Sequence, residues 1–148
     1  ALVQQDTAWA ASIGRLQSIP GIGLVTAAWL VVSTMNFTGC ANAEAATAYA
    51  GLAPHPWQSG TSVHGRGHIG HGGDSRLRTA LYMASLSAVR YNPAIKRHYE
   101  RLRAAGKPVK VARCAAARKL LHLAWAVGTK QQTFNPDHGA PKVVELAA

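Results

Sequence analysis

Residues 57–73, WQSGTSVHGRGHIGHGG, form a glycine-rich segment in which Ser59 stands directly before Gly60. A serine hydroxyl attacks an ester only when a base, a metal ion or strong charge stabilisation activates it. Glycines allow a backbone to lie close to a ligand, and Arg66 adds a positive charge within the same segment. A loop serine can also simply bond to its own backbone. These residues by themselves leave both interpretations of Ser59 open, and Ser62 is a second hydroxyl nearby.

The segment contains no convincing activator for this serine. His64 is near in sequence, yet nothing in the sequence shows that it reaches Ser59. The spacing of His64, His68 and His71 could suit zinc, but no cysteine pair or fourth ligand accompanies them. We therefore interpret the histidines as polar loop residues or phosphate contacts. No metal site is expected in this chain.

Positive charge is concentrated in the same half of the chain. The 148 residues include 16 Lys and Arg against 6 Asp and Glu, and 13 of the 16 lie within 59–119, where only Asp74 and Glu100 oppose them. A merely soluble surface mixes both signs, so this basic region predicts a polyanionic partner. The candidate phosphate-contacting side chains are Arg66, Arg76, Arg78, Lys96, Arg97, Lys107 and Lys110.

Hydropathy favours nucleic acid over a membrane as that partner. The longest apolar run, residues 24–32, contains a threonine and is too short to span a bilayer. The first residues, ALVQQDTAWAAS, lack the basic flank and apolar stretch of a signal peptide. Cys40 and Cys114 are far apart and belong to no motif, so buried reduced thiols in a cytosolic protein are expected.

The stretch 16–30, LQSIPGIGLVTAAWL, is the most specific local signal. A helix ends, a Pro-Gly-Ile-Gly turn follows and a second helix begins, with Ile19 and Ile22 suited to anchoring the turn in the core. Backbone N–H groups of Gly21, Ile22 and Gly23 and of the next helical turn would then suit a phosphate. This order resembles a helix-hairpin-helix motif, which grips the DNA backbone without reading sequence. Such hairpins can also serve only as protein scaffolds.

The rest of the chain predicts a mainly α fold without a strand-rich region. The expected order is a helix-hairpin-helix, a glycine-rich loop or short irregular hairpin, and a bundle of three longer helices. The boundaries rest on capping residues and helix breakers. Asp6 would start a first helix that runs to about Gln17, and a short helix would start at Asn42 and stop at Gly51. Asp74 or Ser75 would start the next helix. A basic helix over 94–105 would start at Asn92-Pro93 and stop at Gly106, and a last helix would run from Pro108 to about Val127.

Three stretches together identify a family. Besides the hairpin, these are AYAGLAPHPWQSGTSVHGRGHIGHGGDSRLRTALYMAS (48–85) and RYNPAIKRHYERLRAAGKPVKVARCAAARKLLHLAWAV (90–127). They resemble the C-terminal Tnp domain of the IS-one-ten type insertion-sequence transposases, also called bridge-RNA-guided recombinases. The resemblance covers roughly residues 9–135. It implies a Tnp catalytic and DNA-binding domain over 1–135, and the composition of the remaining residues, 136–148, predicts a loosely ordered tail.

The resemblance assigns the chemistry. The family's Tnp domain supplies a nucleophilic serine in a Ser-Gly motif, which corresponds to Ser59 followed by Gly60. That serine would become covalently joined to DNA. A RuvC-like domain with four acidic residues, absent from this chain, would hold a divalent metal such as Mg²⁺ and complete a composite site. The family usually carries Lys or Arg where this chain has His71, which lowers the local charge.

The resemblance also implies partners: DNA, a guide (bridge) RNA, the RuvC-like domain of the same protein and further copies in a homo-oligomer. It implies a prokaryotic, nucleoid-associated location and no membrane partner. Two alternatives stay open at this point. One is a non-catalytic helix-hairpin-helix module that binds nucleic acid, with Ser59 as a loop residue. The other is an RNA-binding assembly domain whose main role is dimerisation.

Overall fold

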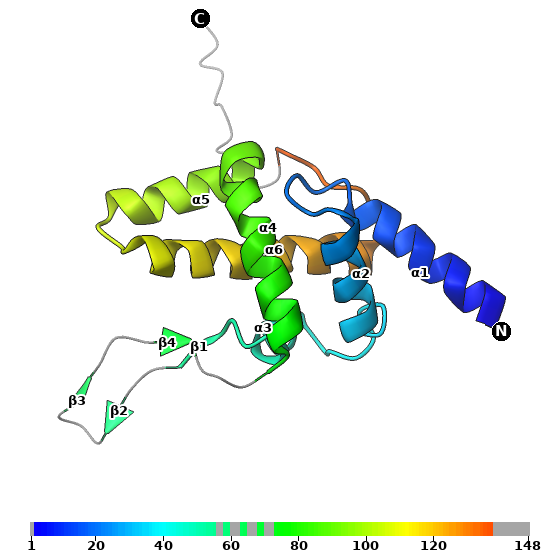
Figure 1. The fold of residues 1–148 in the computed structure, drawn as a ribbon, viewed down its shortest axis with the longest axis horizontal. Helices are drawn as coiled ribbons and strands as arrows, with labels where there is room; N and C mark the ends of the chain where they lie inside the picture. The colour runs from blue at the N-terminus through cyan, green and yellow to red at the C-terminus, as the bar shows by residue number, and fades with distance from the viewer. Residues whose placement is uncertain (1, 56–57, 60–62, 65–67, 70–72, 138–148) are drawn as a thin grey trace, which may run out of the picture.

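A computed structural model describes residues 2–55, 58–59, 63–64, 68–69 and 73–137 of the chain, and they form a mainly helical fold (Figure 1). The predicted fold class is confirmed. The helices are α1 (Leu2–Leu16), α2 (Leu24–Ser33), α3 (Ala43–Tyr49), α4 (Ser75–Tyr91), α5 (Pro93–Ala104) and α6 (Val109–Lys130). Four two-residue strands separate α3 from α4: β1 (Pro54–His55), β2 (Gln58–Ser59), β3 (Val63–His64) and β4 (His68–Ile69).

Helix α6 is the centre of the core. It packs against α1, α3, α4 and α5, and α4 crosses it in Figure 1. Its buried positions are mostly alanine, which lets neighbouring backbones approach closely; they are Ala112, Ala116, Ala117, Leu120, Leu121, Ala124 and Val127. Within the described residues, no helix combines the length and the apolar character that a membrane crossing requires.

Side-chain caps set three of the helix starts, as the sequence predicts. The Asn42 side chain accepts from Ala45 N at 2.8 Å and starts α3. Asp74, rather than Ser75, is the cap of α4 and accepts from Arg76 N and Leu77 N at 3.0 and 3.1 Å. Asn92 caps α5, with Pro93 in its first turn. Each acceptor satisfies N–H groups that have no partner inside the helix.

The predicted start of the first helix is wrong. Helix α1 begins at Leu2, so Asp6 lies within it and its side chain is exposed. A capping residue expresses a local preference only, and the good helix formers before Asp6, Gln4 and Gln5, extend the helix toward the N-terminus. At the other end of the chain, α6 continues to Lys130, past the predicted end near Val127.

A left-handed turn follows α2. Met35, Asn36 and Phe37 all have positive φ, at 50°, 55° and 66°. The Thr34 hydroxyl holds this turn because it donates to Leu30 O at 2.6 Å and accepts from Phe37 N at 2.9 Å. The turn places the buried Phe37 ring edge-on to Trp125 of α6, with ring centroids 5.7 Å apart.

The strands form a nested antiparallel hairpin. β1 pairs with β4, and inside them β2 pairs with β3. In Figure 1 the hairpin extends away from the helices, from the end where α3 and α4 meet. This agrees with the predicted short irregular hairpin. The adjacent Gly73 has φ of 86° and lies so close to Tyr49 O that a Cβ would be 2.6 Å from it. The chain therefore passes directly beside the end of α3 before α4 begins.

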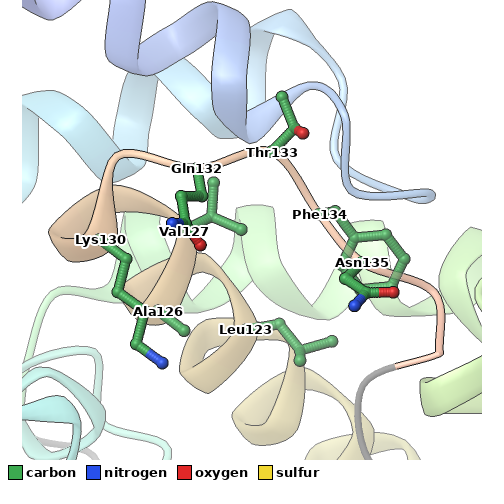
Figure 2. A pocket seen from close by; sticks show the side chains of 8 residues that line it. All are labelled: Leu123, Ala126, Val127, Lys130, Gln132, Thr133, Phe134 and Asn135. Carbon is green, nitrogen blue, oxygen red and sulfur yellow. The ribbon is translucent and has the colours of Figure 1, made fainter.

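The segment after α6 folds back along that helix. Phe134 N donates to Ser18 Oγ at 2.9 Å, and the Phe134 side chain packs against the core. Figure 2 shows this segment and α6 enclosing a small pocket of about 140 Å³, with Leu123 and Val127 on the helix side. Order therefore extends through the predicted domain end at 135, and residues 138–148 of the predicted tail lie outside the described residues.

The turn between α1 and α2 is attached to the junction of α4 and α5. Gly21 has φ of 102°, and a Cβ on it would be 2.7 Å from the Cβ of Ala88. Asn92, which is fully buried, donates from Nδ2 to Pro20 O at 3.2 Å. Ile19 and Ile22 are buried as predicted. A glycine at 21 is therefore required by backbone conformation and by close packing on α4.

We predict that Gly21→Ala lowers the free energy of unfolding by more than Gly106→Ala. Both glycines have positive φ, but a Cβ on Gly106 would meet nothing within 4 Å. Gly106→Ala should cost about 1–2 kcal/mol from left-handed strain alone, and Gly21→Ala roughly 1–3 kcal/mol more from overpacking against Ala88. Urea denaturation of the two variants measures the difference. Equal losses would show that the turn does not depend on this contact.

Candidate nucleic-acid interface

Ser59 ends β2, at the inner pair of the strand hairpin. The register opposes Ser59 with Val63 and Gln58 with His64, so His64 is not the cross-strand partner of the serine. Gly60 and Arg66, predicted to contact DNA, lie outside the described residues, as do Ser62 and His71. Of the histidines considered above, His64 and His68 belong to different strand pairs.

The strand that ends at Ser59 lies away from the helices in Figure 1. Among described residues, the backbone of β1 lies beside that of β4 and the backbone of β2 beside that of β3, and none of the four lies beside a helix backbone. In Figure 1 the described strands β2 and β3 lie apart from the helices.

The α1–α2 turn offers backbone N–H groups but no charge. No side chain caps the N-terminus of α2 at Gly23, and a Cβ at Gly23 would meet nothing within 4 Å. Residues 16–33 contain no charged side chain. Instead, Leu24 and Val25 are 61% and 69% exposed at the start of α2. Any phosphate held here would have to rely on backbone N–H groups and the helix dipole.

The start of α4 carries two of the predicted basic residues. Its N–H groups at Arg76 and Leu77 are already bonded to the Asp74 carboxylate, so they do not form a vacant anion site. The exposed Arg76 guanidinium lies 5.8 Å from the centre of the Trp29 ring, a cation–π distance that fixes it toward α2. Arg78 is half-buried one turn into the helix.

The predicted contacts are spread over the molecule. Gly21 touches α4 at Ala88, whereas Arg76 is near the other end of that helix, about 18 Å away at ~1.5 Å per residue. Lys96 and Arg97 are exposed on α5. This helix begins after Asn92, which contacts the α1–α2 turn at Pro20. Lys107 and Lys110 are exposed at the α5–α6 turn, at the far end of α5. These positions could follow an extended polyanion but do not form one pocket.

A more concentrated cationic site lies between α5 and α6, and the sequence interpretation missed it. We call it the α5–α6 cleft; it measures about 340 Å³ and is lined by His98, Ala115, Arg118, Lys119, His122, Leu123 and Ala126. Arg101 Nη2 lies 3.0 Å from His98 Nδ1. The signal in the sequence was the i, i+4 spacing of Arg118 and His122, which places both on one face of a helix.

Electrostatics in this cleft are dominated by uncompensated positive charge. Partial burial, followed by the charges of Lys119, Arg101 and Arg118, lowers the pKa of His98 from 6.5 to about 4. Partial burial and the nearby Arg101 and Arg97 likewise lower the pKa of Lys119. Both shifts have the same cause, since each group loses water and faces only like charges. A negative group in the cleft would relieve that repulsion.

Comparison with known proteins identifies the family. The sequence model of the Transposase IS116/IS110/IS902 family matches residues 14–100, which is more than half of the chain. The chain belongs to this transposase family. The matched range includes the α1–α2 turn, the strand hairpin with Ser59, α4 and most of α5. The predicted resemblance is confirmed.

Individual relatives agree with this membership. The chain is 37% identical over 133 residues to the insertion element IS110 uncharacterized 43.6 kDa protein of Streptomyces coelicolor, covering 90% of this chain and 32% of that protein. It is 38% identical over 122 residues to the pilin gene-inverting protein of Moraxella bovis, covering 81% and 38%. The insertion element IS900 uncharacterized 42 kDa protein of Mycobacterium paratuberculosis is 32% identical over 120 residues, covering 80% and 30%. The chain thus spans about a third of these relatives' length.

The pKa of His98 predicts an acid-sensitive component of stability. The unfolded chain binds a proton at His98 below about pH 6.5, whereas the folded chain does so only below about pH 4. Acidification through that window therefore favours the unfolded state. We expect the free energy of unfolding to fall between pH 6.5 and 4, and to fall less in His98→Gln. Denaturant titrations at several pH values measure this, and parallel pH profiles for the two proteins would contradict it.

Proposed function

We propose that this transposase domain binds DNA and supplies Ser59 as the nucleophile for strand cleavage and rejoining. The observation that carries the proposal is the family match over residues 14–100, which includes Ser59 and its glycine-rich surroundings. The name of the pilin gene-inverting relative is consistent with DNA rearrangement. The basic region over 59–119 supports a polyanionic substrate.

The proposed step transfers a phosphoryl group without loss of the ester. Ser59 Oγ forms a bond to a backbone phosphorus, the P–O bond to one strand end breaks, and that end leaves as a hydroxyl. The serine proton goes to a base, and the leaving oxygen gains a proton. Attack by a strand hydroxyl on the phosphoserine diester reverses the reaction and rejoins DNA, because the number of phosphodiester bonds is unchanged.

Activation of Ser59 is proposed to come from a separate domain. Among the described residues, the backbone of β2 lies beside β3 and beside no helix, and no group of three or more potential metal ligands is present. A carboxylate site in a RuvC-like domain holding Mg²⁺ would stabilise the developing negative charge. The relatives are about three times as long as the matched region, which leaves room for such a domain.

Further partners follow from the same proposal. A guide RNA would select the target by base pairing, so the contacts of this domain need only recognise backbone. A homo-oligomer would bring the domains of several copies to one DNA junction. A cytoplasmic, nucleoid-associated location follows from a DNA substrate.

A covalent-adduct assay tests the nucleophile. The longer transposase, with the part that its relatives carry outside the matched region, is incubated with nicked DNA and Mg²⁺ and then denatured. We expect labelled DNA to remain attached to the protein, and Ser59→Ala to remove the adduct while DNA affinity changes little, since one hydroxyl adds no charge. Ser62→Ala is the matched control and should keep the adduct. An adduct that persists in Ser59→Ala would assign the nucleophile to another residue.

A second candidate function, assembly through α2, is favoured by one observation. The exposed side of α2 has an apolar groove of about 380 Å³ lined by Leu24, Val25, Ala28, Trp29 and Val32. Exposed apolar surface of this kind is typical of protein contacts. In this alternative the exposed side of α2 binds a second copy of the chain, and Ser59 is only a loop residue.

Sedimentation measurements test the assembly alternative. If α2 mediates self-association, Val25→Lys should weaken the dimer by at least tenfold, because a lysine charge would have to be buried in an apolar interface. Thr38→Lys, exposed in the turn beyond α2, is the control for added charge. A chain that stays monomeric at all concentrations, with or without the substitution, would exclude this role for α2.

A further inference from the structure

The α5–α6 cleft combines basic and histidine side chains with the apolar Ala115, Leu123 and Ala126. Its polar lining consists of His98 from α5 and of Arg118, Lys119 and His122 from α6. Arg101 lies at its edge, bonded to His98. Glu100 is the acidic residue of α5, but it is exposed and is not among the charges that act on His98 or Lys119.

The bond between Arg101 and His98 fixes where the histidine proton resides. A guanidinium can only donate, so His98 Nδ1 is the acceptor of the 3.0 Å bond from Arg101 Nη2. The proton of the neutral ring is therefore on Nε2. His98 thus has an Nε2–H donor and stays uncharged at neutral pH, because its pKa is about 4.

The second histidine is held by α3. The Thr47 hydroxyl donates its single proton to Ala43 O at 2.8 Å. Toward His122 it can only accept, so His122 Nε2 is the donor of the 3.1 Å contact. This bond fixes the His122 ring at the wall of the cleft and links the cleft to α3.

We propose that the α5–α6 cleft binds a phosphate of a nucleic-acid backbone, with Arg118 and Lys119 as its charged donors and His98 Nε2–H as a neutral one. The inference rests on the proposed function, because it takes nucleic acid as the ligand. A phosphodiester matches the site since it presents several acceptor oxygens and one negative charge, whereas the cleft offers several donors and no acid.

The position of the cleft extends the predicted contact surface. Exposed Lys96 and Arg97 lie on α5 before His98, and Lys107 and Lys110 lie at the turn into α6. A bound phosphate in the cleft would connect these separate positions along one strand. The charge of Arg97 contributes to the lowered pKa of Lys119, so the exposed basic residues of α5 and the cleft influence each other electrostatically.

Salt-dependent binding of duplex DNA and of single-stranded RNA to this chain tests the proposal. We expect Arg118→Gln and Lys119→Gln each to reduce the slope of log K against log salt by about 0.9 for duplex DNA, or about 0.7 for a single strand. Lys119→Arg, which retains the charge, should restore most of the wild-type slope. Lys130→Gln, at the exposed end of the same helix, is the control for charge removal and should change the slope less.

A measurement on the wild-type chain keeps the test independent of folding in the variants. Histidine NMR titration should show the pKa of His98 rising from about 4 when nucleic acid is added, because a phosphate offsets Arg101, Arg118 and Lys119. Inorganic phosphate and polyglutamate are the comparison ligands. A rise with nucleic acid at concentrations where these two have no effect supports the proposal.

The remaining outcomes are distinguishable. No change at His98 while the wild-type chain binds nucleic acid would overturn the cleft assignment and leave the proposed function intact. The cleft assignment would also be overturned if Lys130→Gln and Lys119→Gln reduced the slope of log K against log salt equally. A rise with polyglutamate alone would assign the cleft to an acidic protein partner instead. Failure of the wild-type chain to bind any nucleic acid would contradict the proposed function itself.

Discussion

The burial of α6 on several sides is the constraint on which the rest of the structure depends. A helix that contacts α1, α3, α4 and α5 must be apolar around most of its circumference, and its side chains must be small where neighbouring backbones approach. Ala116, Ala117 and Ala124 meet that requirement. The polar residues of α6 are thereby confined to what is left of its surface. Arg118, Lys119 and His122 consequently line one cleft beside α5, where partial burial removes water from charges that have no acid to oppose them.

The second organising feature is the joint at Asn92. One fully buried side chain starts α5 by accepting from Ala94 N at 3.1 Å and holds the α1–α2 turn by donating to Pro20 O at 3.2 Å. Both ends of its amide are used, so loss of the residue would affect helix start and turn together. Because Gly21 packs on Ala88 beside this joint, the position of the α1–α2 turn is set by the α4–α5 junction rather than by the turn's own sequence.

The serine-bearing hairpin differs from both of these regions. Its described strands are two residues long and pair only with each other, so no described helix contact fixes their orientation. If Ser59 acts as proposed, the contacts that orient it would come from DNA and from a second domain.

The sequence by itself determined most helix boundaries, the mainly α class, the family and the identity of Ser59 as the candidate nucleophile. These depend on local signals, such as the caps Asn42 and Asp74, or on a linear motif, and neither needs tertiary contacts. Only the tertiary structure decided that Phe37 packs against Trp125 from a left-handed turn and that His98 meets Arg118 and Lys119. The physical reason is that each of these depends on packing between segments far apart in the chain, which local preference does not encode.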